Sequence, residues 1–453
     1  MKNVTLIILL LLSISGHSQE KPIRSYSFSL DQAIAHALEN NYKAINASRD
    51  IEIAKAKKWE TTASGLPQIN AGVDYINNFK LQSQAIKGAL FPNPDGTPGD
   101  PNQITVLAFG TKHNMTARST LSQLIFDGSY IVALQASKVY LDYYQNAKQK
   151  SNTEIREMVT NSYGNVLLAE ESIAILNKNK STLEKTLNDT QETFKNGLIE
   201  EENVEQLQIT LSSINSNLNN TTRLREIAYK MLKIAIGVDI NDSLTLTDKL
   251  DNLTIQNLDI ALTGTEFSVK ENIDYKIADN FTKQRNLEYK LEKSKALPTL
   301  SANVNFGYNS FSNTFNFANT DQKWYNYSNL GVGLNIPIFS SFARSARSQQ
   351  AKIAYEQSKT QLTEAEQNLQ LQYQSAVSEY DFSVAEYNTA KTNLNLAERI
   401  ERKQQIKFTE GLSSSFDFSE AQRQLFTAQQ NYLQSMVDII NKKAAIEKIT
   451  NNK

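Results

Sequence analysis

The chain has 453 residues and a formal net charge of −1, with 47 basic residues against 48 acidic ones. A nucleic-acid-binding protein carries a basic patch or a strongly basic domain, so this balance argues against a nucleic-acid partner. The sequence has no Cys, which excludes disulfides, thiolate metal sites and cysteine nucleophiles. Only 16 Gly and 8 Pro occur, too few for a loop-rich globular protein of this length.

The N-terminus has the pattern of a secretory signal peptide, residues 1–18. Lys2 supplies the charge, Val4–Ile14 is almost continuously apolar, and small residues precede a cut after Ser18. A membrane anchor is the alternative, but the run is too short to cross ~30 Å of hydrocarbon. Without a Cys at the cleavage site, the mature N-terminus cannot be lipidated. No other segment is apolar enough for a spanning helix, so any membrane segment must be built from strands.

Strand-like alternation marks four segments, at about 68–75, 115–126, 300–309 and 329–336. Apolar and polar residues alternate there with period two, as in a strand with one apolar and one wet face. Transmembrane barrels show such alternation over roughly ten residues, although a soluble sheet over a core gives the same signal. A long polar connection joins each strand pair, from Phe79 to His113 and from Asn309 to Lys323.

Helical periodicity fills most of the rest. A capping box at Ser29 and Gln32 opens a helix towards Ser64. Two long helical segments follow, at about 128–194 and 341–408, and each precedes a Gly-Leu turn and a returning helix. Apolar residues at heptad spacing on the returning helices indicate antiparallel coiled-coil hairpins. These residues are Val204, Leu207, Leu211, Ile214 and Leu218, and Phe418, Ala421, Leu425, Ala428 and Tyr432.

The chain contains the same unit twice. The segment Leu66–Tyr75 is echoed by Leu297–Phe306, and Phe194–Leu198 is echoed by Phe408–Leu412. Two matches in the same order indicate duplication of a domain-sized unit. We therefore expect a first repeat at 19–240, an equatorial or linker segment at 241–270, and a second repeat at 271–453, each repeat with a helix, a strand pair and a hairpin.

Four strands cannot close a barrel around a lumen, because natural barrels begin at about eight strands. Open sheet edges are not tolerated in lipid. If the strands lie in a membrane, several copies of the chain must therefore close one barrel together.

This order of elements resembles the TolC-like outer-membrane efflux proteins. The opening helix around Leu30–Asn41 is similar to that of the family, although Tyr42 stands where the family usually has Pro. The segment Gly411–Leu425 resembles the family's second-hairpin motif. Residues 125–128 and 336–339 look like its strand-to-helix transitions.

The resemblance implies an α+β membrane protein that assembles as a homotrimer, with a twelve-stranded β-barrel in outer-membrane lipid and an α-helical tunnel in the periplasm. It further implies a periplasmic adaptor (membrane fusion) protein and an inner-membrane pump of the RND or ABC type as partners. Such a channel subunit is a passive conduit, not an enzyme, and needs no cofactor. The cargo, whether drug, metal ion or protein, is not indicated.

A polar stripe follows the second returning helix beside its apolar seam. The spacing of three and four places its members on one helix face, and we expect that face to line the lumen near the periplasmic entrance. By resemblance, Asp417 and Glu420 match an acidic entrance ring, whose crowded carboxylates would favour cations and raise each other's pKa. Two solvated surface carboxylates are the alternative. The stripe consists of Asp417, Glu420, Gln424, Thr427 and Asn431, and continues to Gln434.

The two hairpin turns are candidate adaptor contacts, because glycine permits close backbone approach and an exposed leucine is an apolar anchor. These residues are Gly197, Leu198, Gly411 and Leu412; simple turn chemistry explains them equally well. We expect no catalytic, cofactor or metal site, since His36 and His113 lie in different elements. The main rival is a periplasmic coiled-coil scaffold or tether, and a secreted glycan-binding or hydrolytic protein is a more distant one.

Overall fold

The computed structural model describes residues 24–87, 90, 95–100, 102–258 and 267–451. The predicted signal peptide therefore lies outside the described residues. The chain forms two compact units, one from the described parts of 1–50, 145–277 and 363–453, and the other from those of 51–144 and 278–362. Each unit draws on both sequence repeats.

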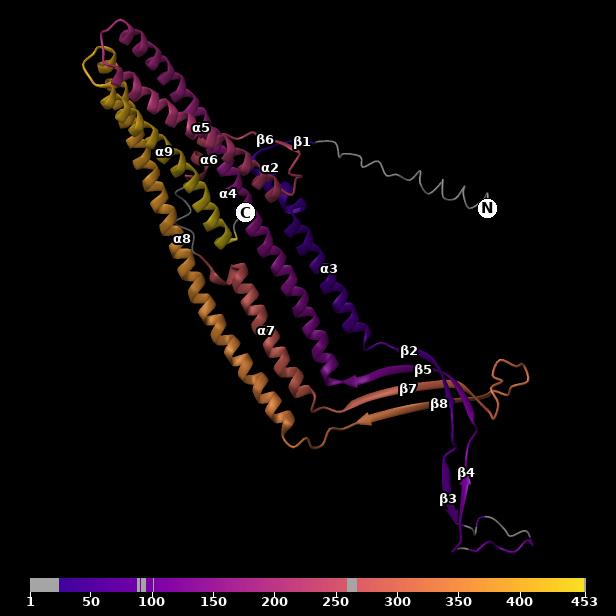
Figure 1. Cartoon of the computed structure of the whole chain (residues 1–453). Helices are drawn as coiled ribbons and strands as arrows, with labels where there is room; N and C mark the ends of the chain where they lie inside the picture. The colour runs from indigo at the N-terminus through magenta and orange to yellow at the C-terminus, as the bar shows by residue number, and fades with distance from the viewer. Residues whose placement is uncertain (1–23, 88–89, 91–94, 101, 259–266, 452–453) are drawn as a thin grey trace, which may run out of the picture. The chain divides into compact units, whose positions relative to one another are not determined.

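A four-stranded antiparallel sheet is the main feature of the second unit (Figure 1). Its strand order is β2-β5-β7-β8, so β5 and β7 join the two predicted strand pairs. All four predicted strands are thus confirmed. Their bounds are Gln68–Asn77 for β2, His113–Asp127 for β5, Thr299–Ser312 for β7 and Tyr325–Asn335 for β8.

The register of the sheet separates an apolar face from a polar one. Ile69, Leu121, Val304 and Leu330 pair across the four strands in one row, and each side chain is 36–74% exposed. One residue further along β2, Asn70 begins a row on the opposite face. That row continues through Thr120, Asn305 and Asn329, with the Thr120 hydroxyl donating to Asn305 at 2.8 Å and Asn305 to Asn329 at 2.9 Å.

The long connection between β2 and β5 contains a second, two-stranded ribbon that the sequence analysis missed. Its strands are β3, Ser83–Lys87, and β4, Ile104–Ala108, and they pair antiparallel. At the start of β5, the side chain of His113 is buried and its Nδ1 lies 2.8 Å from the Tyr75 hydroxyl.

Two helical hairpins dominate the first unit (Figure 1). The long helices α4 and α8 each lead through a tight turn into a returning helix, as the sequence predicts. Glycine is required at both turns, because Gly197 and Gly411 have φ of 74° and 71°, a conformation that costs other residues free energy. The bounds are Gly128–Lys195 for α4, Glu201–Ile236 for α5, Ala343–Thr409 for α8 and Ser415–Thr450 for α9.

The predicted heptad seams form the helical core. On α5, Val204, Leu207 and Ile214 are buried in a cluster with leucines of α4. Phe418 of α9 is fully buried in the same cluster and stacks on Phe408 of α8, with ring centroids 5.3 Å apart. This packing between hairpins fixes which face of α9 remains exposed.

The opening helix is interrupted, which corrects the prediction of one helix from Ser29 to Ser64. The capping box at Ser29 is present, but α2 ends at Asn40 and α3 begins at Tyr42. Asn41 has extended backbone, and its side chain donates to Ala235 O at 2.7 Å and accepts from Lys43 N at 2.7 Å. The Asn41 side chain thus accepts from a backbone amide in the first turn of α3 and ties the break to the end of α5. The bounds are Leu30–Asn40 for α2 and Tyr42–Ala63 for α3.

The segment predicted as equatorial contains mixed secondary structure. Strand β6 pairs in parallel with β1 near the start of the described chain, and α6 packs on α9. Residues 259–266 of this segment lie outside the described residues. The bounds are Ser25–Phe28 for β1, Ser243–Leu246 for β6, Leu250–Asn257 for α6, Val269–Glu271 for the short helix η3 and Ile273–Ser294 for α7.

Within the described ranges, no helix combines the length and the apolar composition needed to traverse a lipid bilayer.

Candidate functional site

The predicted polar stripe lies on the exposed face of α9. Asp417, Gln424, Thr427, Asn431 and Gln434 are all exposed, and Glu420 is half-buried. The buried seam of Phe418, Ala421 and Leu425 holds α9 against its neighbours, so the stripe is left facing outward. The structure thus presents these side chains on one accessible face.

Four members of the stripe line a groove between α8 and α9. The groove has a volume of about 770 Å³. Its α9 wall carries Gln424, Thr427, Asn431 and Gln434, followed by Asp438. The α8 wall, which sequence reasoning did not single out, combines polar and apolar residues at heptad spacing. This wall includes Phe382, Glu386, Thr389, Asn393, Leu396 and Ile400.

Asp417 has a structural partner at the start of α9. The Ser414 hydroxyl donates to Asp417 Oδ2 at 2.7 Å, and Asp417 N donates to Ser414 Oγ at 3.1 Å. This capping box satisfies backbone groups at the helix start. The hydrogen bonds from Ser414 lower the pKa of the Asp417 carboxyl. Within one chain, the carboxylate is therefore kept ionised.

Glu420 is paired with Arg423, one helical turn along α9. Arg423 Nη2 and Nε donate to the two carboxylate oxygens of Glu420 at 2.7 and 2.9 Å. Gln424 Nε2 adds a third hydrogen bond at 3.1 Å. The hydrogen bonds from Arg423 and Gln424 lower the pKa of Glu420. The expected rise of these pKa values concerns crowding between copies of the chain and stays a prediction.

Arg423 is the residue that the sequence analysis overlooked. Its side chain lines the α8–α9 groove and also a smaller groove of about 310 Å³ between α5 and α9, which Glu420 lines as well. The signal was present in the sequence, since an Arg three residues after a Glu on an exposed helix face forms such a pair. The local charge of Asp417, Glu420 and Arg423 is thus −1, where the two acids alone give −2.

The hairpin turns present their leucines to solvent. Leu198 is 75% exposed and Leu412 is 77% exposed. Each turn closes with backbone hydrogen bonds, such as Leu412 N to Lys407 O at 2.7 Å. A methyl group added to Gly197 or Gly411 would meet no atom within 4 Å. Both turns are therefore accessible to solvent.

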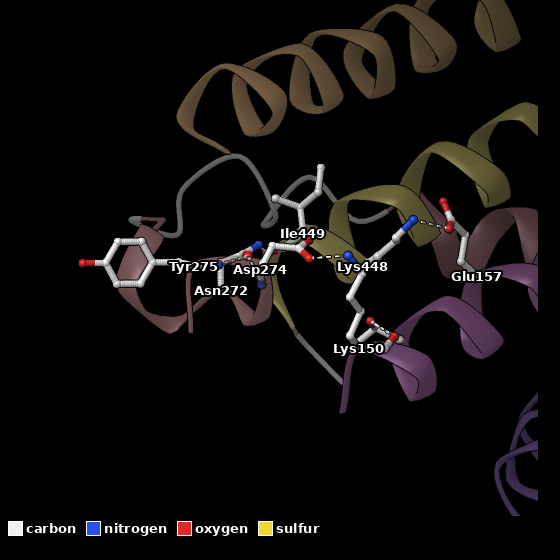
Figure 2. A network of polar contacts seen from close by, with 8 residues as sticks. Lys150, Glu157, Asn272, Asp274, Tyr275, Lys448 and Ile449 are labelled. Carbon is white, nitrogen blue, oxygen red and sulfur yellow. Dashed lines mark hydrogen bonds and ion pairs between the residues drawn. The ribbon is translucent and has the colours of Figure 1, made fainter. Parts of the chain in front are cut away.

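A polar network at the end of α9 ties it to α4 and to the start of α7 (Figure 2). Lys448 Nζ lies 2.8 Å from Glu157, and Lys150 Nζ lies 2.6 Å from Asp274. Asn272, which is 2% exposed, donates to Ile449 O at 2.7 Å and accepts from Asp274 N at 2.7 Å. This junction fixes the C-terminal end of the helix that carries the stripe.

No group of three or more His, Asp or Glu side chains among the described residues is arranged to hold a metal ion. His36 Nδ1 lies 3.0 Å from the backbone oxygen of Ile236.

Comparison with known proteins bears on this arrangement. Residues 282–452 match the family model of outer membrane efflux proteins. The outer membrane protein TolC of Vibrio cholerae serotype O1 is 23% identical over 436 residues, covering 91% of this chain and 88% of that protein.

Solved structures share the fold. A structure of CusC, described in terms of folding and transmembrane channel formation, aligns with a TM-score of 0.73 at 15% identity and covers 96% of this chain and 95% of its own. The outer membrane channel CmeC of Campylobacter jejuni aligns with a TM-score of 0.69 at 17% identity and covers 96% and 90%. The resemblance to TolC-like outer-membrane efflux proteins is confirmed by these matches.

Proposed function

We propose that this chain, similar to outer-membrane efflux proteins over 91% of its length, is one subunit of a passive outer-membrane channel. Three copies close a twelve-stranded β-barrel in the outer membrane and continue it as a helical tunnel in the periplasm. The channel docks with a periplasmic adaptor and an inner-membrane pump of the RND or ABC type. The pump supplies the energy, and the channel performs no covalent chemistry. The leader, residues 1–18, is removed on export, and the mature chain is not lipidated.

The four-stranded sheet is the observation that carries this proposal. Its apolar row is exposed, and neither hydrophobic core among the described residues includes a residue of β2, β5, β7 or β8. Apolar rows without a core need another apolar environment. The opposite polar row suits a water-filled lumen. The rival reading as a soluble scaffold leaves this exposed apolar face without a role.

Unpaired strand edges support assembly from several copies. Strands β2 and β8 form the two ends of the sheet, and each pairs on one side only among the described residues. In lipid, unpaired backbone groups cost several kcal/mol each. Pairing β2 of one copy with β8 of the next removes both edges and closes a ring.

Exposed heptad faces support the same assembly on the helical side. On α5, Leu224, Ile227, Met231 and Ile234 are spaced three and four apart, and each is about half exposed. On α8, Phe382, Leu396 and Ile400 are exposed at the same kind of spacing. Apolar heptad positions without a partner are the seam of a coiled coil. Neighbouring copies are the partners that a closed tunnel provides.

Cysteine crosslinking tests the ring, since the natural chain has no Cys to give background. A panel that combines Asn70→Cys in β2 with a cysteine at Asn329, Gly331 or Gly333 in β8 is oxidised in outer-membrane fractions. We expect covalently linked trimers from at least one pair and none from the single variants. A mature protein recovered only as a water-soluble monomer, with no crosslinked trimer, would overturn the channel and favour the scaffold.

The entrance and docking roles have separate tests. In planar bilayers, Asp417→Ala combined with Glu420→Ala should lower cation preference and cation block; unchanged conductance and block would refute the lining role. A photocrosslinker at Leu198 or Leu412 should capture the adaptor. Capture from neither position, while matched positions on the tunnel wall do crosslink, would leave these turns with a structural role only.

A further inference from the structure

The connection between β8 and α8 exposes several large apolar side chains (Figure 1). Ile338 is 88% exposed, Phe339 75% and Phe342 78%. The two phenylalanine rings contact each other edge to face, with centroids 5.9 Å apart. Ile336, just before them, is also exposed and keeps the alternation of the apolar row of β8. The connection therefore continues the apolar face of the sheet towards the helix.

Backbone strain marks the same connection. Ser341 and Phe342 have φ of 49° and 63°, in the left-handed region that residues with a Cβ rarely adopt. A tight turn closes around them, in which Ala343 N donates to Ser340 O at 2.9 Å. Turns with positive φ at both central positions normally carry Gly or Asn there. Such strain clusters at functional sites, which points to a binding role for the exposed rings.

Two arginines, Arg344 and Arg347, lie in the first two turns of α8. Each donates to a nearby backbone oxygen, at 3.2 and 3.4 Å, and neither guanidinium has a carboxylate oxygen within 4.0 Å among the described residues. No acidic residue occurs in the sequence between Asp321 and Glu356. The helix dipole disfavours cations at a helix start, so their charge is not compensated locally. The exposed apolar surface thus adjoins an unneutralised positive charge.

The corresponding transition in the first repeat lacks both the strain and the cations. Strand β5 leads directly into α4 at Gly128, and Asp127 Oδ1 accepts from Ser129 N at 2.7 Å. No residue of this transition has a positive φ, and the first basic residue of α4 is Lys138. The features of the β8–α8 connection are therefore not needed to join a strand to a helix.

A neighbouring copy and the membrane are the two candidate occupants of this surface. In the ring proposed above, β2 of the next copy pairs with β8 and starts at the sheet end where β8 finishes, which brings the end of α3 towards the turn. That end is itself basic: Lys55 and Lys57 pair with glutamates of α3, and Lys58 has no carboxylate oxygen within 4.0 Å among the described residues. Like charges repel, so a second copy does not supply the missing anion.

An anionic phospholipid supplies both missing partners. Its acyl chains accommodate the exposed apolar side chains, and its phosphate matches the planar, two-pronged guanidinium. We propose that Phe339 and Phe342 enter the inner leaflet of the outer membrane and that Arg344 and Arg347 select anionic phospholipid headgroups there. This inference rests on the proposed channel function, and it assigns lipid selectivity to the β8–α8 turn of the second repeat.

Lipid quenching of a fluorophore tests this selectivity, and the natural chain has no Cys to give background labelling. Ala343→Cys replaces an exposed residue between Phe342 and Arg344 and carries the fluorophore. The labelled protein is reconstituted in vesicles of equal parts phosphatidylcholine and phosphatidylglycerol. In one series phosphatidylglycerol carries bromine, a quencher, near the headgroup end of its acyl chains, and in the other series phosphatidylcholine carries it. The ratio of quenching between the two series measures which lipid lies at the turn.

We expect stronger quenching at Ala343→Cys from brominated phosphatidylglycerol. Adding Arg344→Gln or Arg347→Gln should lower the relative affinity for phosphatidylglycerol roughly fivefold each, the factor that one cation contributes near an anionic lipid surface. Arg344→Lys keeps the charge and should retain most of the preference. Arg223→Gln, on the exposed face of α5, removes one cation elsewhere and should leave the preference unchanged.

Two further label positions separate failure of this inference from failure of the channel proposal. Val332→Cys, at a position 64% exposed in the apolar row of β8, should be quenched equally by both brominated lipids. Ile131→Cys, at a position 47% exposed in the first turn of α4, is the matched position in the first repeat and should show no preference for phosphatidylglycerol.

Quenching at Val332→Cys with none at Ala343→Cys would overturn this inference alone, and protection of the second label from aqueous iodide as well would place a second copy over the turn. Equal quenching of Ala343→Cys by the two lipids would also overturn the selectivity while leaving the channel intact. Absence of quenching at all three positions would overturn the channel proposal, and this inference with it.

Discussion

The charge balance at the start of α9 gives the sharpest prediction. Arg423 neutralises Glu420 through two hydrogen bonds of 2.7 and 2.9 Å, while Asp417 is hydrogen-bonded by the uncharged Ser414 in its capping box. The change is Arg423→Gln, which keeps a polar side chain on the exposed face. The local charge per chain is then −2 in the variant, against −1 in the natural protein.

Charge counting orders four proteins by cation preference. Arg423→Gln should be the most cation-selective, and Asp417→Asn, with a local charge of zero, the least. The natural protein and the double variant Arg423→Gln with Asp417→Asn should be alike, because both carry −1. In water at physiological salt, one unit of charge near a passing ion alters its local concentration by roughly two- to fivefold. We expect permeability ratios to shift by factors of that size.

Reversal potentials across planar bilayers with a salt gradient measure this order. Arg223→Gln on the exposed face of α5 is the matched control and should leave the ratio unchanged. Asn retains an oxygen that can accept the Ser414 hydrogen bonds, so the start of α9 should stay folded. If Arg423→Gln and Asp417→Asn give the same permeability ratio as the natural protein, the stripe does not line a conducting path.

Three further predictions concern the titration of Glu420, the glycines that end helices and the junction at Asn272. Arg423 lowers the pKa of Glu420 below the usual range of a glutamate, so Glu420 should stay ionised as pH falls from about 7 to about 5. Recordings across this range should show constant cation selectivity in the natural protein. In Arg423→Gln, cation selectivity should begin to fade at a higher pH. In chemical unfolding, Gly411→Ala should lower the free energy of unfolding by about 1 kcal/mol. Gly237→Ala should lower it by more than about 3 kcal/mol, because the added methyl group would lie 2.2 Å from Asn40 O. Equal losses for the two variants would contradict the packing around Gly237. Asn272→Ala should cost about 2 kcal/mol, and an unchanged unfolding midpoint would show that the junction is not needed.

Local patterns predicted the strands and helices because apolar residues recur with a different period in a strand than in a helix. Alternation located β2, β5, β7 and β8, and heptads located the buried seams of α5 and α9. The ribbon of β3 and β4 was missed because it is short and lies in a segment rich in Pro and polar residues. The break at Asn41 was missed because it depends on a hydrogen bond to Ala235, which lies far away in the sequence.

The candidate site was only partly accessible to the same reasoning. Spacing alone placed Gln424, Thr427 and Asn431 on one face, as the structure describes. It did not indicate that residues of α8 form the opposite wall of a groove, since that requires the packing of two helices. Nor did it indicate that Glu420 is neutralised by Arg423, since a rotamer choice on an exposed face decides this pairing.

The sequence by itself determined which residues lie on the same face of each strand and helix and which lie on the opposite face. Side-chain direction follows from the backbone period of a single element. It also limited what the strands can form by themselves, since four strands cannot close a barrel. Only the tertiary structure decided the joining of β5 to β7 and the groove between α8 and α9. These features arise where distant segments pack together, and the energy of such contacts depends on distances that no local pattern records.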